Sequence, residues 1–150
     1  FLKLSPPLRT EEDRIALVQG LKDELIDVIV SDHKPEDEES KRLTFSQAAT
    51  GASGIETLLS LSLELYHNDS LKLETIIKAL TSNPAKILKI DKGNLSVGND
   101  ADFCIVDINK PWIVKKEKLI SKSKNTSIED KKLQGKVTNT FIKGIELFKL

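Results

Sequence analysis

The sequence has 150 residues, of which 39% are hydrophobic, and this suffices for one ordinary domain with a packed core. Lysine plus arginine equals aspartate plus glutamate at 23 each, so the overall charge gives no reason to expect nucleic acid or an anionic membrane as a partner. No stretch approaches the roughly 20 apolar residues of a membrane span, and no signal peptide is recognisable, so we expect a cytoplasmic protein.

Two residue counts set further expectations. The sequence has no methionine, not even at its first position, so we expect Phe1 to lie inside a longer gene product. It has one cysteine, Cys104, which excludes an internal disulfide. Because Cys104 lies within an apolar run, we expect a buried structural thiol.

The beginning of the chain predicts a strand, a helix and a second strand. Residues 1–5 are apolar-rich, and the prolines at 6 and 7 end that strand because proline cannot donate to a sheet ladder. Residues 10–13, Thr-Glu-Glu-Asp, are typical of a capping box at the start of an amphipathic helix. Residues 27–31 include three consecutive apolar residues, 28–30, without alternation, as in a parallel strand buried on both faces. The apolar positions of the helix are Ile15, Leu17, Val18, Leu21 and Leu25.

A long charged loop and three helices are expected next. Residues 33–53 form the loop, with Leu43 and Phe45 as its hydrophobic peg, and loops of such length in compact folds are functional or disordered. The helices are a leucine-rich, well-buried one from about residue 54 to His67, one over 73–80, and a short one with Pro84 at its first position.

From Gly93 onward, turn and strand signals replace the helical pattern. Residues 103–106 predict a strand, and residues 137–142 are expected to pair with 145–148 across a Lys-Gly turn. This part therefore predicts a separate β layer. Five lysines lie between the strands, and intervening acidic residues favour a solvated surface over an anionic-ligand patch. These lysines are Lys115, Lys116, Lys118, Lys122 and Lys124.

Asp32 is the first candidate for chemistry. In a barrel of β/α units, catalytic groups lie at the carboxyl ends of the strands, and Asp32 immediately follows such an end. The alternative is that Asp32 only caps a turn. His33 is expected to be a hydrogen-bonded spacer rather than a ligand, and His67 to cap the C-terminus of a helix.

Several segments of the sequence together match the motifs of one family. Residues 3–14, KLSPPLRTEEDR, are similar to the stretch usually written K-V-N-P-P-L-R-x-x-x-D-R. Residues 26–35, IDVIVSDHKP, are similar to I-D-x-I-x-T-D-H-A-P, and both segments are specific to dihydroorotases and close cyclic amidohydrolases. The match continues through GIET at 54–57, TSNPA at 81–85, a V-G-x-x-A-D run at 97–102 that the wider superfamily shares, and SKNT at 123–126. The sequence therefore resembles the dihydroorotases, within the amidohydrolase superfamily.

The resemblance implies an α/β fold, namely a distorted TIM-like (β/α)8 barrel with a small β-sandwich domain. Residues 1–90 would hold the last two β/α units of the barrel, and residues 91–150 part of the β domain. A complete barrel needs about 200 to 250 residues, so we expect the His-x-His pair, the other metal ligands and a substrate-binding arginine upstream of Phe1. The two histidines are not at metal-ligand spacing, so we expect no zinc site from this chain alone.

The resemblance also implies a zinc enzyme of pyrimidine biosynthesis that reversibly interconverts N-carbamoyl-L-aspartate and L-dihydroorotate. Asp32 would be the catalytic aspartate beside the metal. It would take a proton from the zinc-bound water during ring opening and return it to the leaving nitrogen.

Four positions match residues with which the family binds substrate: Ser5, Glu36, Thr50 and Gly51. Three of them depart from the usual residue: Ser5 replaces asparagine, Glu36 replaces histidine and Thr50 replaces phenylalanine. A carboxylate at Glu36 would repel an acidic substrate unless Lys34 or Arg42 neutralises it.

Three functions remain open from the sequence. The first is the C-terminal segment of an active dihydroorotase, and the second is an inactive dihydroorotase-like subunit that serves as a scaffold for aspartate transcarbamoylase. The third is another cyclic amidohydrolase, such as a hydantoinase or allantoinase, against which the Pro-Pro-Leu-Arg segment argues. The expected partners are the small-molecule substrate, a second copy of the chain in a homodimer, and the transcarbamoylase.

Overall fold

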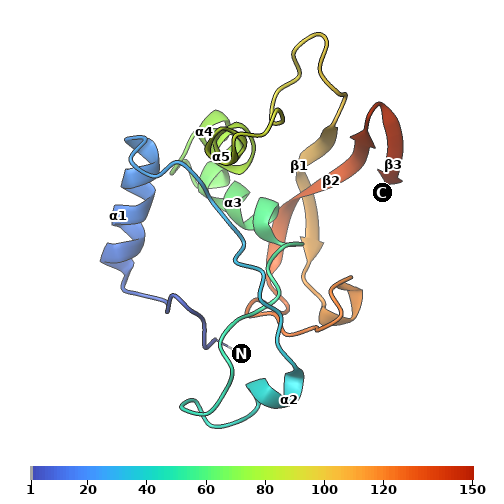
Figure 1. Cartoon of the computed structure of the whole chain (residues 1–150). Helices are drawn as coiled ribbons and strands as arrows, with labels where there is room; N and C mark the ends of the chain where they lie inside the picture. Colours follow the sequence, from blue (N-terminus) through green and yellow to red (C-terminus); the bar gives the residue numbers. More distant parts are fainter. Residues whose placement is uncertain (1) are drawn as a thin grey trace.

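The computed structural model describes residues 2–150 and shows helices followed by an antiparallel sheet (Figure 1). The helices are α1 (Glu11–Lys22), α2 (Glu38–Lys41), α3 (Leu58–His67), α4 (Leu73–Leu80) and α5 (Ser82–Leu88), and the strands are β1 (Phe103–Ile113), β2 (Lys132–Ile142) and β3 (Ile145–Lys149). Within the described part, no helix is long and apolar enough to cross a membrane.

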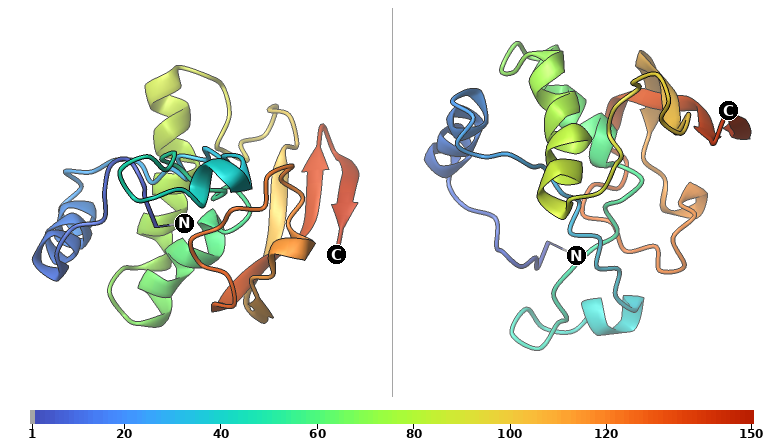
Figure 2. Two further views of the ribbon diagram at one scale, coloured as in Figure 1. Left: turned by 90° about the horizontal axis from the view of Figure 1, so that it is seen from below. Right: turned by 45° about the horizontal axis from the view of Figure 1, so that its top comes forward.

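Helix α1 begins at the predicted capping box. The backbone N–H of Asp13 donates to the Thr10 hydroxyl at 3.3 Å, and the Thr10 N–H donates to the Asp13 carboxylate at 3.1 Å. Leu21 joins the hydrophobic core, but Ile15 and Leu17 remain 55% and 59% exposed. The apolar face of α1 is therefore only partly covered, and Figure 2 shows the helix standing to one side of the other elements.

The core lies where the end of α1 meets α4 and the segment that follows α1. Its buried side chains are Leu21, Leu71, Ile76 and Ala79, against which Ile29 packs. The Ile29 N–H donates to the Ala79 carbonyl at 3.1 Å, which holds the segment before Asp32 against the C-terminal turn of α4.

The two predicted strands at residues 1–5 and 27–31 are wrong for this chain. Phe1 lies outside the described residues, and residues 2–5 and 27–31 run without a sheet ladder. A buried parallel strand needs neighbouring strands with which to form a ladder, and residues 2–150 place no strand beside either segment. Val30 is accordingly 70% exposed instead of buried on both faces. The chain thus shows the helix of the expected β/α unit without its sheet.

Helix α3 begins at Leu58 instead of near residue 54, and it packs on the sheet. Leu63 has no exposed surface, and a Cβ built on Gly135 of β2 would lie 2.3 Å from Leu63 Cδ1. Glycine at this position therefore allows the close approach. The other leucines of α3 are half-buried. His67 is the last residue of α3 and its Nε2 lies 3.0 Å from the Ile108 carbonyl, so it links the helix to β1 while Asn68 takes the C-cap position.

Three smaller expectations need correction. Helix α5 begins at Ser82, so Pro84 is its third residue and not its first. Leu43 and Phe45 are exposed and do not form a buried peg. Cys104 is exposed because α3 contacts the sheet further along, near Gly135, and no described residue covers the thiol.

The predicted hairpin is confirmed. Strands β2 and β3 pair antiparallel, with Ile142 opposite Ile145 and Thr140 opposite Phe148, and β1 pairs with the other edge of β2. The rings of Phe103 and Phe141 stack at 4.7 Å between centroids. The lysine run before β2 behaves as a solvated surface, since Lys115, Lys118 and Lys122 are exposed and Lys115 forms an ion pair with Asp130.

Candidate active site

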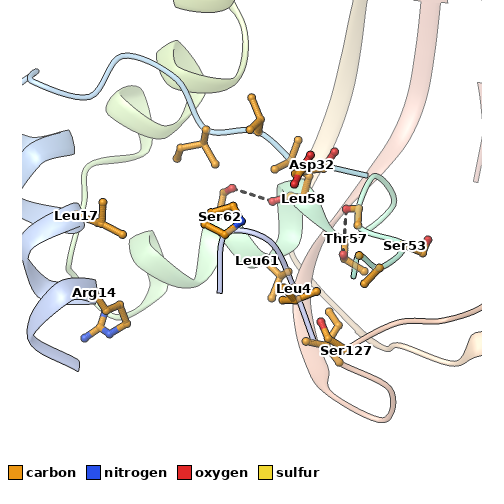
Figure 3. A pocket seen from close by; sticks show the side chains of 18 of the residues that line it. Leu4, Arg14, Leu17, Asp32, Ser53, Thr57, Leu58, Leu61, Ser62 and Ser127 are labelled. Carbon is orange, nitrogen blue, oxygen red and sulfur yellow. Dashed lines mark hydrogen bonds between the residues drawn. The ribbon is translucent and has the colours of Figure 1, made fainter. Parts of the chain in front are cut away.

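A cavity of about 480 Å³ lies between α1 and α3, walled by the segments before α1, before Asp32 and before α3. Its walls are mostly apolar. Three of the five residues expected at the site line it, namely Ser5, Asp32 and Gly51, whereas Glu36 and Thr50 do not. Figure 3 shows Asp32, Thr57 and Ser53 on the side of the cavity away from Arg14 and Leu17 of α1.

Asp32 has an unusual backbone conformation. Its φ is 41°, in the left-handed region that aspartate tolerates better than most residues. Its side chain is exposed, and no hydrogen bond or ion pair joins its carboxylate to another of residues 2–150. Asp32 therefore does not cap a turn with its side chain, and the carboxylate is left available at the cavity.

His33 forms the hydrogen bonds expected of a spacer. Its Nδ1 accepts the backbone N–H of Gly54 at 3.1 Å and that of Ile55 at 3.2 Å. A ring nitrogen that accepts carries no proton, so Nε2 holds the proton of the neutral ring. Gly54 is required here, because a Cβ would lie 2.9 Å from the Ser31 carbonyl. The histidine thus ties the Asp32 loop to the turn before α3.

Glu36 lies beside a cation, outside the cavity wall. Lys34 Nζ is 3.4 Å from Glu36 Oε1, whereas Arg42 pairs with Glu38 and Glu39. Of the two cations considered for neutralising Glu36, the structure places Lys34 against it.

Gly51 is buried, and both of its backbone polar groups are engaged. Its N–H donates to the Lys3 carbonyl at 3.1 Å, and its carbonyl accepts from Lys41 Nζ at 2.8 Å and Asn125 Nδ2 at 3.2 Å. Its φ is 126°, and a Cβ would lie 2.4 Å from the Lys34 carbonyl. No side chain larger than hydrogen fits this backbone.

Two buried residues near the site escaped the sequence analysis. Lys41 lies among exposed charged residues, and nothing local distinguishes it from them. Its Nζ donates to the carbonyls of Lys3, Ala49 and Gly51. Burial lowers the pKa of Lys41, and the charge of Glu36 opposes that shift.

Asn125 is the second of these residues. It lies in the Ser-Lys-Asn-Thr segment noted above, so a motif marked it without indicating a role. Its Oδ1 accepts the Glu36 N–H at 2.9 Å, and its carbonyl accepts the Ser53 N–H at 2.8 Å. Residues after 90 therefore reach the candidate site.

Glu56 of the Gly-Ile-Glu-Thr segment joins the same two parts of the chain. Its carboxylate accepts the backbone N–H groups of Ile120 at 2.9 Å and Ser121 at 3.0 Å. The segment between β1 and β2 is thereby attached to the turn that leads into α3.

The described residues do not complete a metal site. No group of three histidine, cysteine, aspartate or glutamate side chains lies close enough to hold a metal ion anywhere in residues 2–150. Asp32 is the only acid among the described residues that line the cavity, and the Nδ1 of the adjacent His33 is already engaged. A zinc ion would need ligands beyond these.

Dihydroorotases are among the proteins with similar sequences. The chain is 44% identical over 142 residues to the dihydroorotase of Ehrlichia canis (strain Jake), which covers 95% of this chain and 32% of that protein. It is 41% identical over 147 residues to the dihydroorotase of Aquifex aeolicus (strain VF5), and this match covers 98% of this chain and 35% of that protein. These relatives confirm the resemblance seen in the motifs, and the chain spans about a third of their length.

Solved structures of similar shape include hydantoinases and dihydropyrimidinases. The L-hydantoinase (dihydropyrimidinase) from Arthrobacter aurescens matches with a TM-score of 0.88 and 33% identity, covering 98% of this chain and 34% of that one. The dihydropyrimidinase from Brevibacillus agri NCHU1002 matches with a TM-score of 0.91 and 22% identity, covering 99% of this chain and 34% of that one. At this identity, the match supports the fold alone. The family model described as the amidohydrolase family matches residues 4–146, and the chain therefore belongs to the amidohydrolase family.

Proposed function

We propose that the chain is the C-terminal segment of a zinc-dependent dihydroorotase of pyrimidine biosynthesis. The full-length protein would interconvert N-carbamoyl-L-aspartate and L-dihydroorotate. Similarity to dihydroorotases over nearly the whole chain supports this, together with the Pro-Pro-Leu-Arg and Asp-His segments. Because the chain spans only about a third of these relatives, it would be inactive without the rest of the protein.

In this proposal, residues 1–90 belong to the barrel and residues 91–150 to the small β domain. The extended segments before α1 and before Asp32 would become the last two barrel strands once neighbouring strands supply ladder partners. The exposure of Val30 supports this, because a β-branched apolar side chain at this position is suited to a buried strand.

The observation that carries the proposal is the free carboxylate of Asp32 at the cavity. Ring opening requires a water molecule to lose a proton as its oxygen attacks the ring carbonyl carbon, and the ring nitrogen to gain one as the C–N bond breaks. One carboxylate can accept the first proton and deliver the second. Bound zinc would lower the pKa of that water, and its ligands would come from the rest of the protein.

Ser5 and Gly51 would contact the substrate, since both line the same cavity as Asp32. Lys34 beside Glu36 reduces the repulsion that an acidic substrate would meet. Glu36 and Thr50 lie outside the cavity wall, so their contacts with substrate would require the loop to move.

A hydantoinase is the second candidate, because a solved L-hydantoinase shares 33% identity with this chain. The two functions differ in substrate, and a turnover panel separates them. The full-length protein should be assayed on dihydroorotate, carbamoyl aspartate, hydantoin and allantoin. The proposal predicts turnover of the first two alone, whereas preferred turnover of hydantoin or allantoin would overturn it.

No turnover of any of the four compounds would favour the scaffold function. Homodimer formation and binding to aspartate transcarbamoylase stay predictions, which sedimentation of the full-length protein with and without the transcarbamoylase would test.

A further inference from the structure

Lys41 is a buried ammonium whose hydrogen-bond partners are all backbone carbonyls. Lys41 is 5% exposed. Its Nζ donates to the backbone carbonyls of Lys3 at 2.9 Å, Ala49 at 2.9 Å and Gly51 at 2.8 Å. An ammonium has three N–H donors and no acceptor, so three carbonyls satisfy it completely. Burying a charge is costly unless it is fully hydrogen-bonded, and here it is.

The three carbonyls come from the two segments that carry candidate substrate contacts. Lys3 lies two residues before Ser5, and Ala49 and Gly51 flank Thr50. Lys41 itself ends helix α2, inside the loop that follows Asp32. One side chain therefore joins the segment before α1 to both halves of that loop.

Asn125 holds the same Gly51 carbonyl from another side. It is 2% exposed, and it donates from Nδ2 to Gly51 O while its Oδ1 accepts the Glu36 N–H. Two side chains thus donate to one carbonyl, and the Gly51 N–H donates to the Lys3 carbonyl. Both backbone polar groups of Gly51 are therefore hydrogen-bonded, and Gly51 lines the cavity.

Backbone hydrogen bonds also order the loop, since the Lys34 N–H donates to the Ala52 carbonyl at 3.1 Å and the Ala49 N–H donates to the Ser40 carbonyl at 3.0 Å. The large apolar residues of the loop, Leu43 and Phe45, are exposed, and the ion pairs of Arg42 are at the surface, where such pairs contribute little. At Gly51, the buried side-chain donors are those of Lys41 and Asn125, so the position of this peptide depends on them.

We propose that Lys41 is a positioning residue for substrate binding, which with Asn125 fixes Gly51 and the segment before α1 in the arrangement that forms the cavity. This inference rests on the proposed dihydroorotase function. Lys41 does not line the cavity, so it acts through Gly51 and not on the reacting atoms. Arginine would not replace it, because a planar guanidinium cannot direct its donors at three converging carbonyls.

The test is the Lys41→Met change in the full-length protein, with Lys86→Met as the control. Methionine keeps an unbranched chain and removes all three donors, whereas Lys86 is exposed on α5. We expect Lys41→Met to raise KM for dihydroorotate by about tenfold or more and to leave kcat within about twofold, because it lowers the fraction of protein with a binding-competent loop. Lys86→Met should leave both unchanged.

Asn125→Asp supplies a second variant, which replaces the Nδ2 donor with an oxygen and keeps the acceptor for Glu36. It should raise KM in the same way. The KM increase in the double variant should be smaller than the product of the two single increases, because both side chains act through the Gly51 carbonyl. If Lys41→Met does not fold, Asn125→Asp carries the KM test.

A measurement without turnover separates this inference from the proposed function. The Gly51 amide proton should exchange with solvent faster in Lys41→Met than in the parental protein, and the rate in Lys86→Met should match the parental rate. An inactive parental protein would overturn the proposed function, and the exchange rate would then decide whether Lys41 orders Gly51. In an active protein, an unchanged KM in Lys41→Met would overturn the positioning role, whether or not Gly51 exchange or kcat changes.

Discussion

The Nδ1 of His33 accepts the backbone N–H of Gly54 at 3.1 Å, so the residue next to Asp32 is bound to the turn that leads into α3. The same atom accepts the Ile55 N–H. The position of the candidate catalytic carboxylate therefore depends on a contact between segments 21 residues apart in the chain.

We expect His33→Ala to lower the free energy of unfolding by about 1–3 kcal/mol, because two backbone N–H groups lose their acceptor. His33→Asn should recover part of this loss, since an amide oxygen can take the place of Nδ1. Denaturant unfolding of the two variants checks this. If His33 is only a spacer, both variants of the full-length protein should keep the parental zinc content. Loss of zinc in both would identify His33 as a ligand.

Gly51→Ala should destabilise the protein more than Gly98→Ala. Both glycines have positive φ, but a Cβ at Gly51 would lie 2.4 Å from a backbone carbonyl, whereas at Gly98 it would meet nothing within 4 Å. The Gly98 variant therefore measures the backbone cost alone, on the order of 1 kcal/mol, and Gly51→Ala adds the clash. Equal losses in melting temperature would contradict the tight approach of Gly51 to Lys34.

Protonation of the Asp102 carboxylate in acid should lower the free energy of unfolding. Lys92 Nζ donates to Oδ2 of Asp102 at 2.6 Å, and the Lys143 N–H donates to Oδ1 at 2.7 Å. The hydrogen bond from Lys92, and after it the one from Lys143, hold the pKa of Asp102 below its ordinary value. A carboxyl whose pKa is lower in the folded state stabilises the fold above its unfolded pKa, about 3.9, and this contribution disappears as the pH falls through the folded pKa.

Asp102→Asn should therefore weaken the acid dependence of unfolding below about pH 4. Unfolding midpoints measured across this pH range check it, with Asp91→Asn as a control that keeps the parental profile. If Asp102→Asn shows the same acid profile as the parental protein, the Lys92 and Lys143 contacts do not matter in solution.

Local features of the fold could be predicted from the sequence. The capping box of α1 lies within four consecutive residues, and the β2–β3 hairpin turns across Lys143 and Gly144, so both follow from short-range patterns. The segment 27–31 has the composition of a buried strand, but a strand also needs partners, which no local pattern provides. Likewise the apolar run around Cys104 does not reveal which part of the sheet is covered.

The polar network around Gly51 could not be predicted for the same reason. Lys41 reaches a carbonyl 38 residues earlier in the chain, and Asn125 accepts from a backbone 89 residues earlier. Both residues look like ordinary surface residues in sequence, and only the fold buries them. Asp32 is a candidate from the sequence because it immediately follows the strand predicted at residues 27–31, and the structure adds that its carboxylate is free and lines a cavity.

The most direct measurement is turnover of the full-length protein carrying Asp32→Asn. The amide keeps the size of the side chain and cannot accept the proton, so the account predicts parental zinc content and melting temperature with kcat lowered by about 100-fold or more. Asp27→Asn, an exposed acid in the same segment, should retain parental turnover. Near-parental kcat in Asp32→Asn would contradict the account and remove Asp32 from the chemistry.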